Sequence, residues 1–247
     1  MSSANSLFYK WSKTYPIIKN IFLYYNIYIR NFKFFFKNSQ FGEDKKIIKL
    51  FNSKENGTYL DLGCFHPIRQ NNTYLFHKLG WKGINIDLNP LTIDLFNIAR
   101  PNDVNICAAI SNKKGTRNLF FDHDLSSLNT INKNHTIFLE KAFGKSHLQI
   151  KKVKTDTLNN IFIKNKIRKI DFMNIDIEGN ELEVLRTINF KKIDIKVICI
   201  EIVNYNIYSK RIKINKNKIF SILKNNNYYF KFKTYVNYIF IKKEKKN

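Results

Sequence analysis

The strongest constraint on the fold is an alternation of short apolar runs with segments of helical periodicity. Five runs are strongly apolar and end in turn or polar residues: residues 58–63, 83–87, 104–110, 170–176 and 196–202. Between them, apolar residues recur at intervals of three and four, as in Leu182, Leu185 and Ile188. Buried strands that alternate with helices are typical of a mostly parallel sheet with helices on its faces. The sequence therefore predicts an α/β protein.

The C-terminal part of the chain has a different order of elements. Residues 216–225 have helical periodicity, and residues 228–234 and 237–241 form two strand-like runs with almost no loop between them. A connection this short joins only antiparallel strands. We therefore expect the two strands to complete the sheet rather than to begin a second domain.

Aromatic and basic residues alternate in the first 38 residues, as in Tyr24, Tyr28, Arg30 and Lys33. We predict that residues 1–38 form a helical extension packed on a domain of residues 39–247. A helix lying on a membrane surface is the alternative. We expect neither a signal peptide nor a spanning helix, because the longest uncharged stretch in this part, residues 20–29, is only ten residues long.

The chain is strongly basic, with 43 Lys and Arg against 19 Asp and Glu and a formal net charge of +24. Much of the excess lies at the ends: residues 1–41 hold six basic and no acidic residues, and residues 205–247 hold twelve basic residues and one acidic residue. Such a surface suits nucleic acid, an anionic membrane or an acidic glycan. It also follows from a composition rich in Lys, Asn, Ile, Phe and Tyr, whose codons are rich in A and T.

The three cysteines favour a reducing compartment. Cys64, Cys107 and Cys199 are widely separated, without CxxC pairing, and two of them lie in apolar runs. Thiols used as small apolar side chains fit this pattern better than a disulfide framework. We therefore expect a cytoplasmic protein, with the inner face of the membrane as the alternative location.

Acidic residues stand at the predicted carboxyl ends of several strands. Ligands of open parallel sheets bind beyond these ends. The residues delivered there are Asp61 with Gly63, Asp87, Asp176 with Glu178, and Glu201. Asp87 follows Gly63 by 24 residues, where an adenosine site places a carboxylate that accepts hydrogen bonds from the ribose hydroxyls. Glu178 alone has a second explanation, because a carboxylate at a helix N-terminus is stabilised by the helix dipole.

The glycines favour one class of adenosine cofactor. A pyrophosphate requires close approach of the backbone and therefore a GxGxxG turn, whereas here Gly63 is followed by Cys64, Phe65, His66 and Pro67. NAD and FAD are disfavoured for this reason. S-adenosyl-L-methionine has no phosphate and carries a positive sulfonium, so a single-glycine turn beside carboxylates suits it better.

Seven segments together resemble the FkbM-type methyltransferase family, and they follow one another in the family's order over about residues 39–202. The segments are SQFGEDKKI (39–47), GTYLDLGCFHP (57–67), NNTYLFHKLGWKGINIDLNP (71–90), LFNIARPNDVNICAAIS (95–111), SSLNT (126–130), VKTDTL (153–158) and IDFMNIDIEGNELEVL (170–185). Two positions depart mildly from the family's pattern. Cys64 replaces a smaller residue and Asn71 replaces a serine, and both changes concern local loop contacts rather than the fold.

The resemblance implies a fold, a reaction and a set of cofactor residues. The fold is the Rossmann-like class I methyltransferase fold, a mostly parallel seven-stranded sheet with helices on both faces and an antiparallel last strand. The reaction is methylation dependent on S-adenosyl-L-methionine, usually O-methylation of a sugar hydroxyl in a surface glycan or its precursor. The cofactor-binding residues carried over are Asp61, Gly63, Cys64, Asp87, Asn105, Ala108 and Glu43. Gln40 and Asp44 accompany Glu43, although capping of the next helix by Ser39 and Glu43 also explains that segment.

Methyl transfer to a hydroxyl calls for a general base. The candidates are Asp176, Glu178 and His66, and we favour Asp176 with Glu178 as an acidic pair at the acceptor, with His66 as a positioning group or alternate base. The same carboxylates together with Glu201 could instead hold a divalent cation. Our working hypothesis is chemistry without a metal ion, so no metal site is predicted.

Two other classes of function stay open. A nucleic-acid-binding or nucleic-acid-methylating protein would use the basic ends. It is disfavoured, because DIEG stands after the fourth strand where base methylases commonly present an NPPY-like motif. A fold that has lost catalysis and only binds a partner is disfavoured by the carboxylates it retains. The expected partner is a small molecule or glycan with a free hydroxyl, with peripheral contact to an anionic membrane as an option, and the sequence predicts no oligomeric state.

Overall fold

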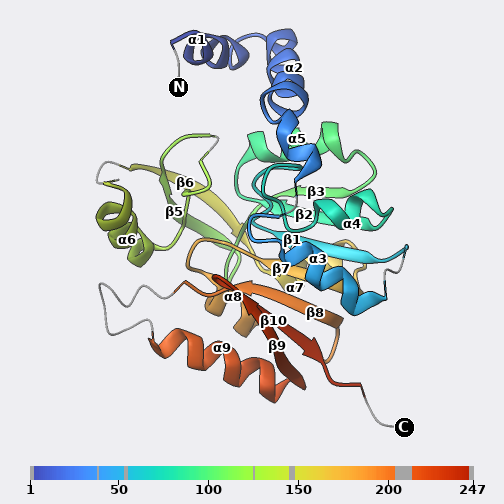
Figure 1. The fold of residues 1–247 in the computed structure, drawn as a ribbon. Coiled ribbons are helices and arrows are strands. Elements are labelled where there is room, and N and C mark those ends of the chain that lie inside the picture. The colour runs from blue at the N-terminus through green and yellow to red at the C-terminus, as the bar shows by residue number, and fades with distance from the viewer. Residues whose placement is uncertain are drawn as a thin grey trace.

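The structure is a computed structural model that describes residues 3–37, 39–52, 55–124, 126–144, 148–203 and 213–244. A seven-stranded sheet with the order β3-β2-β1-β7-β8-β10-β9 runs through the molecule (Figure 1). Its strands are β1 (Thr58–Leu62), β2 (Lys82–Asp87), β3 (Val104–Cys107), β7 (Lys169–Ile175), β8 (Asp194–Glu201), β9 (Tyr228–Thr234) and β10 (Asn237–Lys242).

The strands from β3 to β8 in this order are all parallel to their neighbours. The last strand of the chain, β10, lies antiparallel to β8 on one side and to β9 on the other. The fold class predicted from the sequence, a mostly parallel sheet with an antiparallel last strand, is therefore confirmed. The expectation that the C-terminal pair completes the sheet is confirmed as well.

Helices cover both faces of the sheet because successive side chains of each strand point to opposite faces. On β1, Leu60 and Leu62 face one layer, whereas Tyr59 faces the other. The first layer holds α7 (Leu158–Lys164), α8 (Glu181–Thr187) and α9 (Lys213–Asn225). The second holds α3 (Glu43–Ile48), the 3-10 turn η3 (Lys49–Phe51) and α4 (Tyr74–Lys78), while α5 (Pro90–Ala99) contacts β2 and β3.

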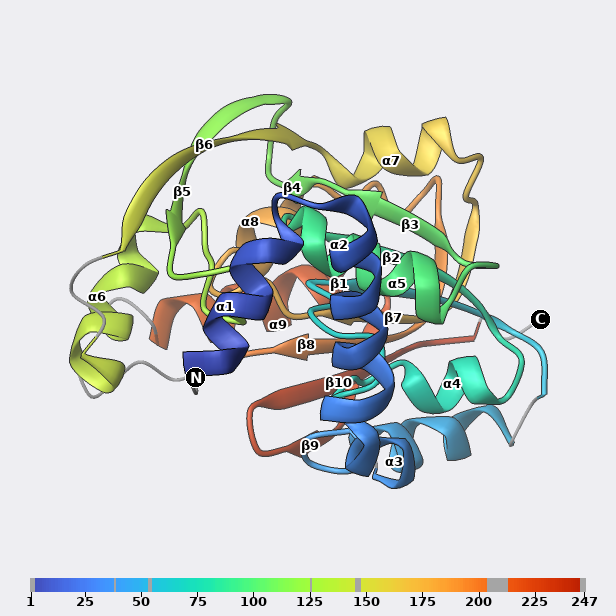
Figure 2. The same ribbon diagram turned by 90° about the horizontal axis from the view of Figure 1, so that it is seen from above.

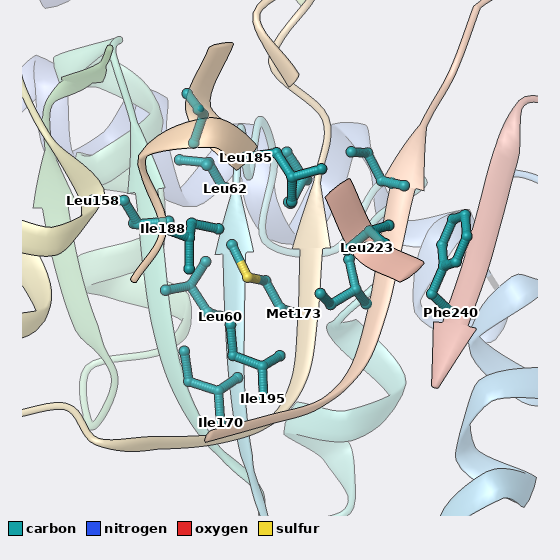
Figure 3. Close-up of a cluster of buried hydrophobic side chains, with 14 of the residues drawn as sticks. Leu60, Leu62, Leu158, Ile170, Met173, Leu185, Ile188, Ile195, Leu223 and Phe240 are labelled. Atoms are coloured by element: carbon teal, nitrogen blue, oxygen red, sulfur yellow. The ribbon is translucent and has the colours of Figure 1, made fainter. Parts of the chain in front are cut away.

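The larger apolar cluster lies between the sheet and the first helical layer (Figure 3). Leu60, Met173 and Ile195 project from neighbouring strands toward Leu185 of α8 and Leu223 of α9, and all five are fully buried. Burial of a side chain of this size contributes about 1.5 to 3 kcal/mol to folding. This packing fixes the strands whose ends form the candidate site.

A second, three-stranded sheet was not predicted. It has the order β4-β6-β5, with β4 (Ala109–Ile110), β5 (Gly115–Phe121) and β6 (Gln149–Asp156). The single strand expected over residues 104–110 is wrong, because the chain passes from one sheet to the other at Ala108, whose N–H donates to the Asp87 carbonyl at 2.9 Å. The polar sequence of β6, which buries only Thr155, gives no strand signal.

The N-terminal segment is helical, as expected, but broken into several pieces. It comprises α1 (Ser3–Ser12), α2 (Pro16–Tyr24), a π-helical stretch η1 (Tyr25–Arg30) and a 3-10 stretch η2 (Phe32–Phe36). The remaining described helix, α6 (Lys133–Phe143), lies between β5 and β6 and is not part of this segment. Leu23 and Ile27 pack against Ile68 and Leu95. No helix in the described ranges is long and apolar enough to cross a membrane. The domain boundary at residue 38 stays a prediction.

Candidate active site

A cavity of about 460 Å³ lies where β1, β2 and β7 end. Gly63, Asp87 and Asp176 line it from the sheet edge. Residues 126–129 and two side chains of α6, His135 and Phe138, line it from the side of the small sheet. The cavity therefore lies at the edge of the sheet where the sequence predicts a ligand.

Gly63 permits a close approach of two chain segments at the floor of the cavity. Its φ of +79° belongs to the left-handed region that favours glycine. A Cβ atom at this position would lie 1.7 Å from the Asp176 carbonyl oxygen. Any side chain here would therefore push apart the ends of β1 and β7.

Asp87 is fixed at the end of β2 by backbone donors. Its Oδ2 accepts from the Phe65 N–H at 3.0 Å, and its Oδ1 accepts from the Asn89 N–H at 2.8 Å. Burial raises the pKa of Asp87 to about 6, against the opposing effect of these two hydrogen bonds. Each oxygen keeps acceptor capacity for a ligand hydroxyl. The carboxylate thus fits the ribose-binding role expected of it.

Asp61 lines the cavity but is largely occupied by neighbouring side chains. Its Oδ2 accepts from Asn71 Nδ2 at 2.9 Å and from Thr73 Oγ1 at 2.8 Å, and its Oδ1 accepts from Asn174 Nδ2 at 2.9 Å. Behind them, the buried Arg100 donates to Thr73 Oγ1 and to Asn71 Oδ1, both at 2.9 Å. Asp61 therefore holds the loop between β1 and α4, a role that the sequence did not indicate.

Four carboxyl groups gather beyond β7 and β8. Asp176 and Glu201 share a hydrogen bond, and burial together with the neighbouring carboxylates raises both pKa values well above the ordinary range. A hydrogen bond between two carboxyl groups requires that one of them carries the proton. Glu181 accepts from the N–H groups of Ile177 and Gly179, both at 3.0 Å, and so fixes the turn that carries the fourth member, Glu178.

Glu178 has the most distinctive environment of this group. Burial raises its pKa to about 7. Its φ of +53° is unusual for a residue with a side chain, and its carbonyl accepts from Thr130 Oγ1 at 2.8 Å. Strained backbone of this kind persists where the surroundings hold it, often at functional sites. Glu178 therefore presents an ionisable carboxyl group, with a pKa near neutrality, to the cavity.

His135 is a site residue that the sequence did not reveal. Its Nε2 lies 3.0 Å from Glu178 Oε2. Burial lowers the pKa of His135 to about 4, so the imidazole is neutral at pH 7. It comes from α6, in the part of the chain that carries the unpredicted sheet. A lone histidine on a helix with no recognisable motif gave no signal by which it could have been found.

Three residues expected at the site do not line the cavity described here. His66 Nδ1 accepts from the N–H groups of Ile68 and Arg69 at 3.1 and 3.0 Å, and its Nε2 lies 3.2 Å from Asn31 Nδ2. Burial and nearby arginines lower its pKa to about 3. This geometry shows His66 holding its own loop outside the cavity lining, and it does not support the role at the acceptor expected of it.

Glu43 and Asn105 are the other two expected site residues that do not line the cavity. Glu43 accepts from Asn237 Nδ2 at 2.7 Å and from the Phe41 N–H at 3.0 Å, so it supports Phe41, which does line the cavity. Asn105 donates to Asn97 Oδ1 on the outer side of β3. Direct contact with a cofactor in the cavity is therefore not supported for either residue.

The remaining expected residues lie at or beside the cavity. Gln40, Cys64 and Ala108 line it together with Gly63 and Asp87. The alternative of helix capping by Ser39 and Glu43 is not what the structure shows, because α3 has its N-cap at Gly42 without a side-chain cap. Ser39 Oγ instead donates to Asp44 Oδ1 at 2.9 Å and accepts from the Asp44 N–H at 3.3 Å. Across the described residues, no three His, Cys, Asp or Glu side chains are arranged to hold a metal ion.

Comparisons with known proteins give a family and a structural neighbour. A family model described as the methyltransferase FkbM domain matches residues 58–230. Among solved structures, the chain is similar to a TehB-like SAM-dependent methyltransferase from Corynebacterium glutamicum. The identity is 11%, the TM-score is 0.41, and the match covers 81% of this chain and 87% of that one. No curated protein matches the sequence.

Proposed function

The chain belongs to the FkbM methyltransferase family, and we propose that it methylates a hydroxyl oxygen of a sugar in a surface glycan or its precursor. As a member of this family it is a methyltransferase whose cofactor is S-adenosyl-L-methionine. The observation that carries the proposed O-methylation is the half-buried Glu178, whose pKa its surroundings raise to about 7, in the cavity that also holds the candidate ribose ligand.

The residues at the floor of the cavity fit the cofactor. Gly63 lets the ends of β1 and β7 meet at this floor, and Asp87 has acceptor capacity for two ribose hydroxyls. Ala108, at the crossing between the sheets, also lines this part of the cavity. The nearby carboxylates suit a positively charged sulfonium. Gly63, Asp87 and Ala108 would therefore hold the adenosine end of the cofactor.

The cofactor, when bound, supplies an electrophilic methyl group whose bond to sulfur breaks as the new carbon–oxygen bond forms. The chain must hold the acceptor oxygen in line with that bond, which lowers the barrier by several kcal/mol, on the order of 7 in well-oriented systems. It must also remove the hydroxyl proton. In this proposal Glu178 takes that proton, because its pKa of about 7 balances availability against basicity.

The other carboxyl groups and His135 have supporting roles. Asp176 and Glu201, which share a proton, are poor bases near pH 7 but can position the acceptor by hydrogen bonding. His135, 3.0 Å from Glu178, fixes the direction in which that carboxyl group points. Asp176 thus keeps the place at the acceptor that the sequence predicts for it, while the base itself is assigned to Glu178.

Label transfer tests the proposal. The purified chain would be incubated with methyl-tritiated S-adenosyl-L-methionine and, in parallel, with polysaccharide, glycolipid and total RNA fractions. We expect label in a carbohydrate fraction, recovered after acid hydrolysis as an O-methyl sugar, and none above background with Glu178→Gln. Label confined to RNA, or equal labelling by Glu178→Gln, would contradict the proposal.

A further inference from the structure

A stripe of exposed apolar side chains runs along the N-terminal helices. Nine of the seventeen large apolar side chains exposed in the described part of the chain lie between Trp11 and Phe36. Six of them recur at intervals of three and four and define what we call the apolar stripe: Ile17, Ile21, Tyr24, Tyr28, Phe32 and Phe36. At this spacing Ile17, Ile21 and Tyr24 share one face of α2.

Ring contacts make the stripe continuous across the change of helix type. Tyr24 stacks on Tyr28 with ring centroids 5.8 Å apart, and Tyr28 stacks on Phe35 at 6.0 Å. Phe32 then contacts both Phe35 and Phe36, at 6.2 and 5.5 Å. The stripe is therefore one surface rather than a set of scattered side chains.

The opposite face of the same helices already packs on the protein. Phe22, Leu23 and Ile27 are buried, and the last two contact Ile68 and Leu95 of the domain. A surface helix ordinarily carries polar residues on the side turned away from the core. A second apolar face on such a helix indicates that something other than water covers it.

The positive charge of this N-terminal segment indicates an anionic partner. The first 42 residues contain six basic residues and no acidic residue. Lys13 and Lys19 pair with Asp124 and Asp94, at 2.6 Å each, whereas Arg30, Lys33 and Lys37 lie exposed beside the stripe. A row of aromatic and aliphatic side chains flanked only by cations complements the headgroup region of an anionic bilayer.

We propose that the apolar stripe seats the protein on an anionic membrane surface, with its side chains at headgroup level. The arrangement of the helices agrees with a flat partner. In Figure 1, α1 and α2 project from one end of the molecule, and in Figure 2, seen from that end, they lie in front of the domain. A projecting ridge meets a flat surface more readily than it fills a groove. Tyrosine is suited to this depth, because its ring meets hydrocarbon while its hydroxyl meets water, and phenylalanine buries an apolar ring beside it.

The seated helices are attached to the wall of the cavity. Tyr9 of α1 and Lys13, the residue that follows α1, both bind the Asp124 carboxylate. Asp124 lies two residues before Ser126, the first residue of the cavity wall formed by residues 126–129. A membrane-seated enzyme would therefore hold its cavity near the surface, within reach of a membrane-anchored acceptor. This last consequence rests on the proposed function, whereas the seating itself does not.

Vesicle sedimentation tests the seating directly. The full chain would be mixed with phosphatidylcholine vesicles, and with vesicles containing phosphatidylglycerol, at low and at raised salt. The stripe variant Ile17→Ser with Phe36→Ser removes side chains that are 76% and 79% exposed. The matched control, Ile150→Ser with Ile163→Ser, removes side chains that are 64% and 71% exposed on β6 and α7. All of these positions face water, so folding is expected to survive, and thermal unfolding would verify that.

The proposal requires binding to the anionic vesicles that weakens with salt. The partition coefficient should fall about tenfold or more in the stripe variant and remain within about twofold of wild type in the control. Absence of binding by wild type, or equal binding by the stripe variant, would overturn the proposal. It would also be overturned if light scattering showed a dimer of the wild type that the stripe variant dissociates, because a second copy would then cover the stripe.

Discussion

At the scale of single residues, the neighbouring side chains distinguish carboxyl groups that look alike in the sequence. Asp176 and Glu201 hydrogen-bond to each other, and burial holds their pKa values well above the ordinary range, so the pair keeps a proton. Glu178 is half-buried, with a pKa of about 7, and faces a neutral histidine instead. Of these three groups, Glu178 is the one suited to accept a proton near neutral pH.

Replacement of Glu178 by Gln should separate catalysis from cofactor binding. Gln has nearly the same shape but cannot accept the hydroxyl proton, so we expect kcat to fall roughly a hundredfold or more. Affinity for S-adenosylhomocysteine, measured by calorimetry, should stay within about threefold of wild type. Retention of full activity would remove Glu178 from the proposed reaction.

The pH dependence of the reaction also tests whether Glu178 is the base. A base acts in its unprotonated form, so a carboxyl group whose pKa is raised to about 7 should make kcat rise with pH and level off above that value. An ordinary glutamate would already have levelled off near pH 5.5. A rate profile that is flat from pH 5.5 to 8 would contradict this assignment.

Gly63 is expected to tolerate no side chain, and Gly144 offers a matched control. Both have positive φ, +79° and +63°, but only at Gly63 would a Cβ atom meet another atom, at 1.7 Å. Gly144→Ala should therefore cost only the backbone strain, about 1 kcal/mol. Gly63→Ala should cost more than about 3 kcal/mol in the free energy of unfolding, measured in urea. Equal losses would show that β1 and β7 can separate at this point.

The sequence could not assign every side chain of the candidate site, for reasons visible at this scale. A resemblance fixes a residue's position along the chain, and the carboxyl ends of the strands bring Gly63, Asp87 and Asp176 together as predicted. It does not fix where a side chain in a loop points. His66 turns back to the N–H groups of its own loop, and His135 arrives from a helix that no motif marks.

At the scale of elements, the loop between β1 and α4 depends on one buried cation. Arg100, just after α5, donates to Asn71 and Thr73, which in turn bind Asp61. Its ring contacts include Phe96, with the guanidinium carbon 4.9 Å from the centroid. Arg100 therefore connects α5 to the cofactor loop without itself reaching the cavity.

Arg100→Met should weaken the fold and loosen that loop. Removal of a buried, hydrogen-bonded charge leaves its partners unpaired and costs roughly 3 to 5 kcal/mol. The control is Arg186→Met, at an exposed position on α8, which should lower the free energy of unfolding by less than about 0.5 kcal/mol. Unfolding in urea measures both. A loss below about 1 kcal/mol for Arg100→Met would show that the loop does not depend on this residue.

The elements differ in how well the sequence predicts them. Apart from β3, which ends at Cys107 rather than at Ile110, the core strands were found to within about two residues, because buried parallel strands are short and uniformly apolar. The small sheet was missed, since β5 and β6 expose polar side chains on both faces and pair mainly with each other. Their pairing depends on register between distant segments, which no local pattern records.

At the scale of the whole molecule, the sheet supplies a rigid edge and the less regular parts complete the cavity. The apolar layers fix the ends of β1, β2 and β7 (Figure 3). The segment from residue 109 to residue 156, with α6, closes the cavity from the other side and contributes His135. The division of labour is typical of α/β enzymes, in which loops carry the specificity of a common fold.

The central claim is that this cavity binds the cofactor through Asp87, and calorimetry with S-adenosylhomocysteine tests it most directly. Asp87→Ala is compared with Asp94→Ala, a surface carboxylate on α5 that pairs with Lys19. We predict that wild type and Asp94→Ala bind equally, while Asp87→Ala loses about tenfold or more in affinity, or about 1.4 kcal/mol. Binding by Asp87→Ala as tight as that of wild type would contradict the account.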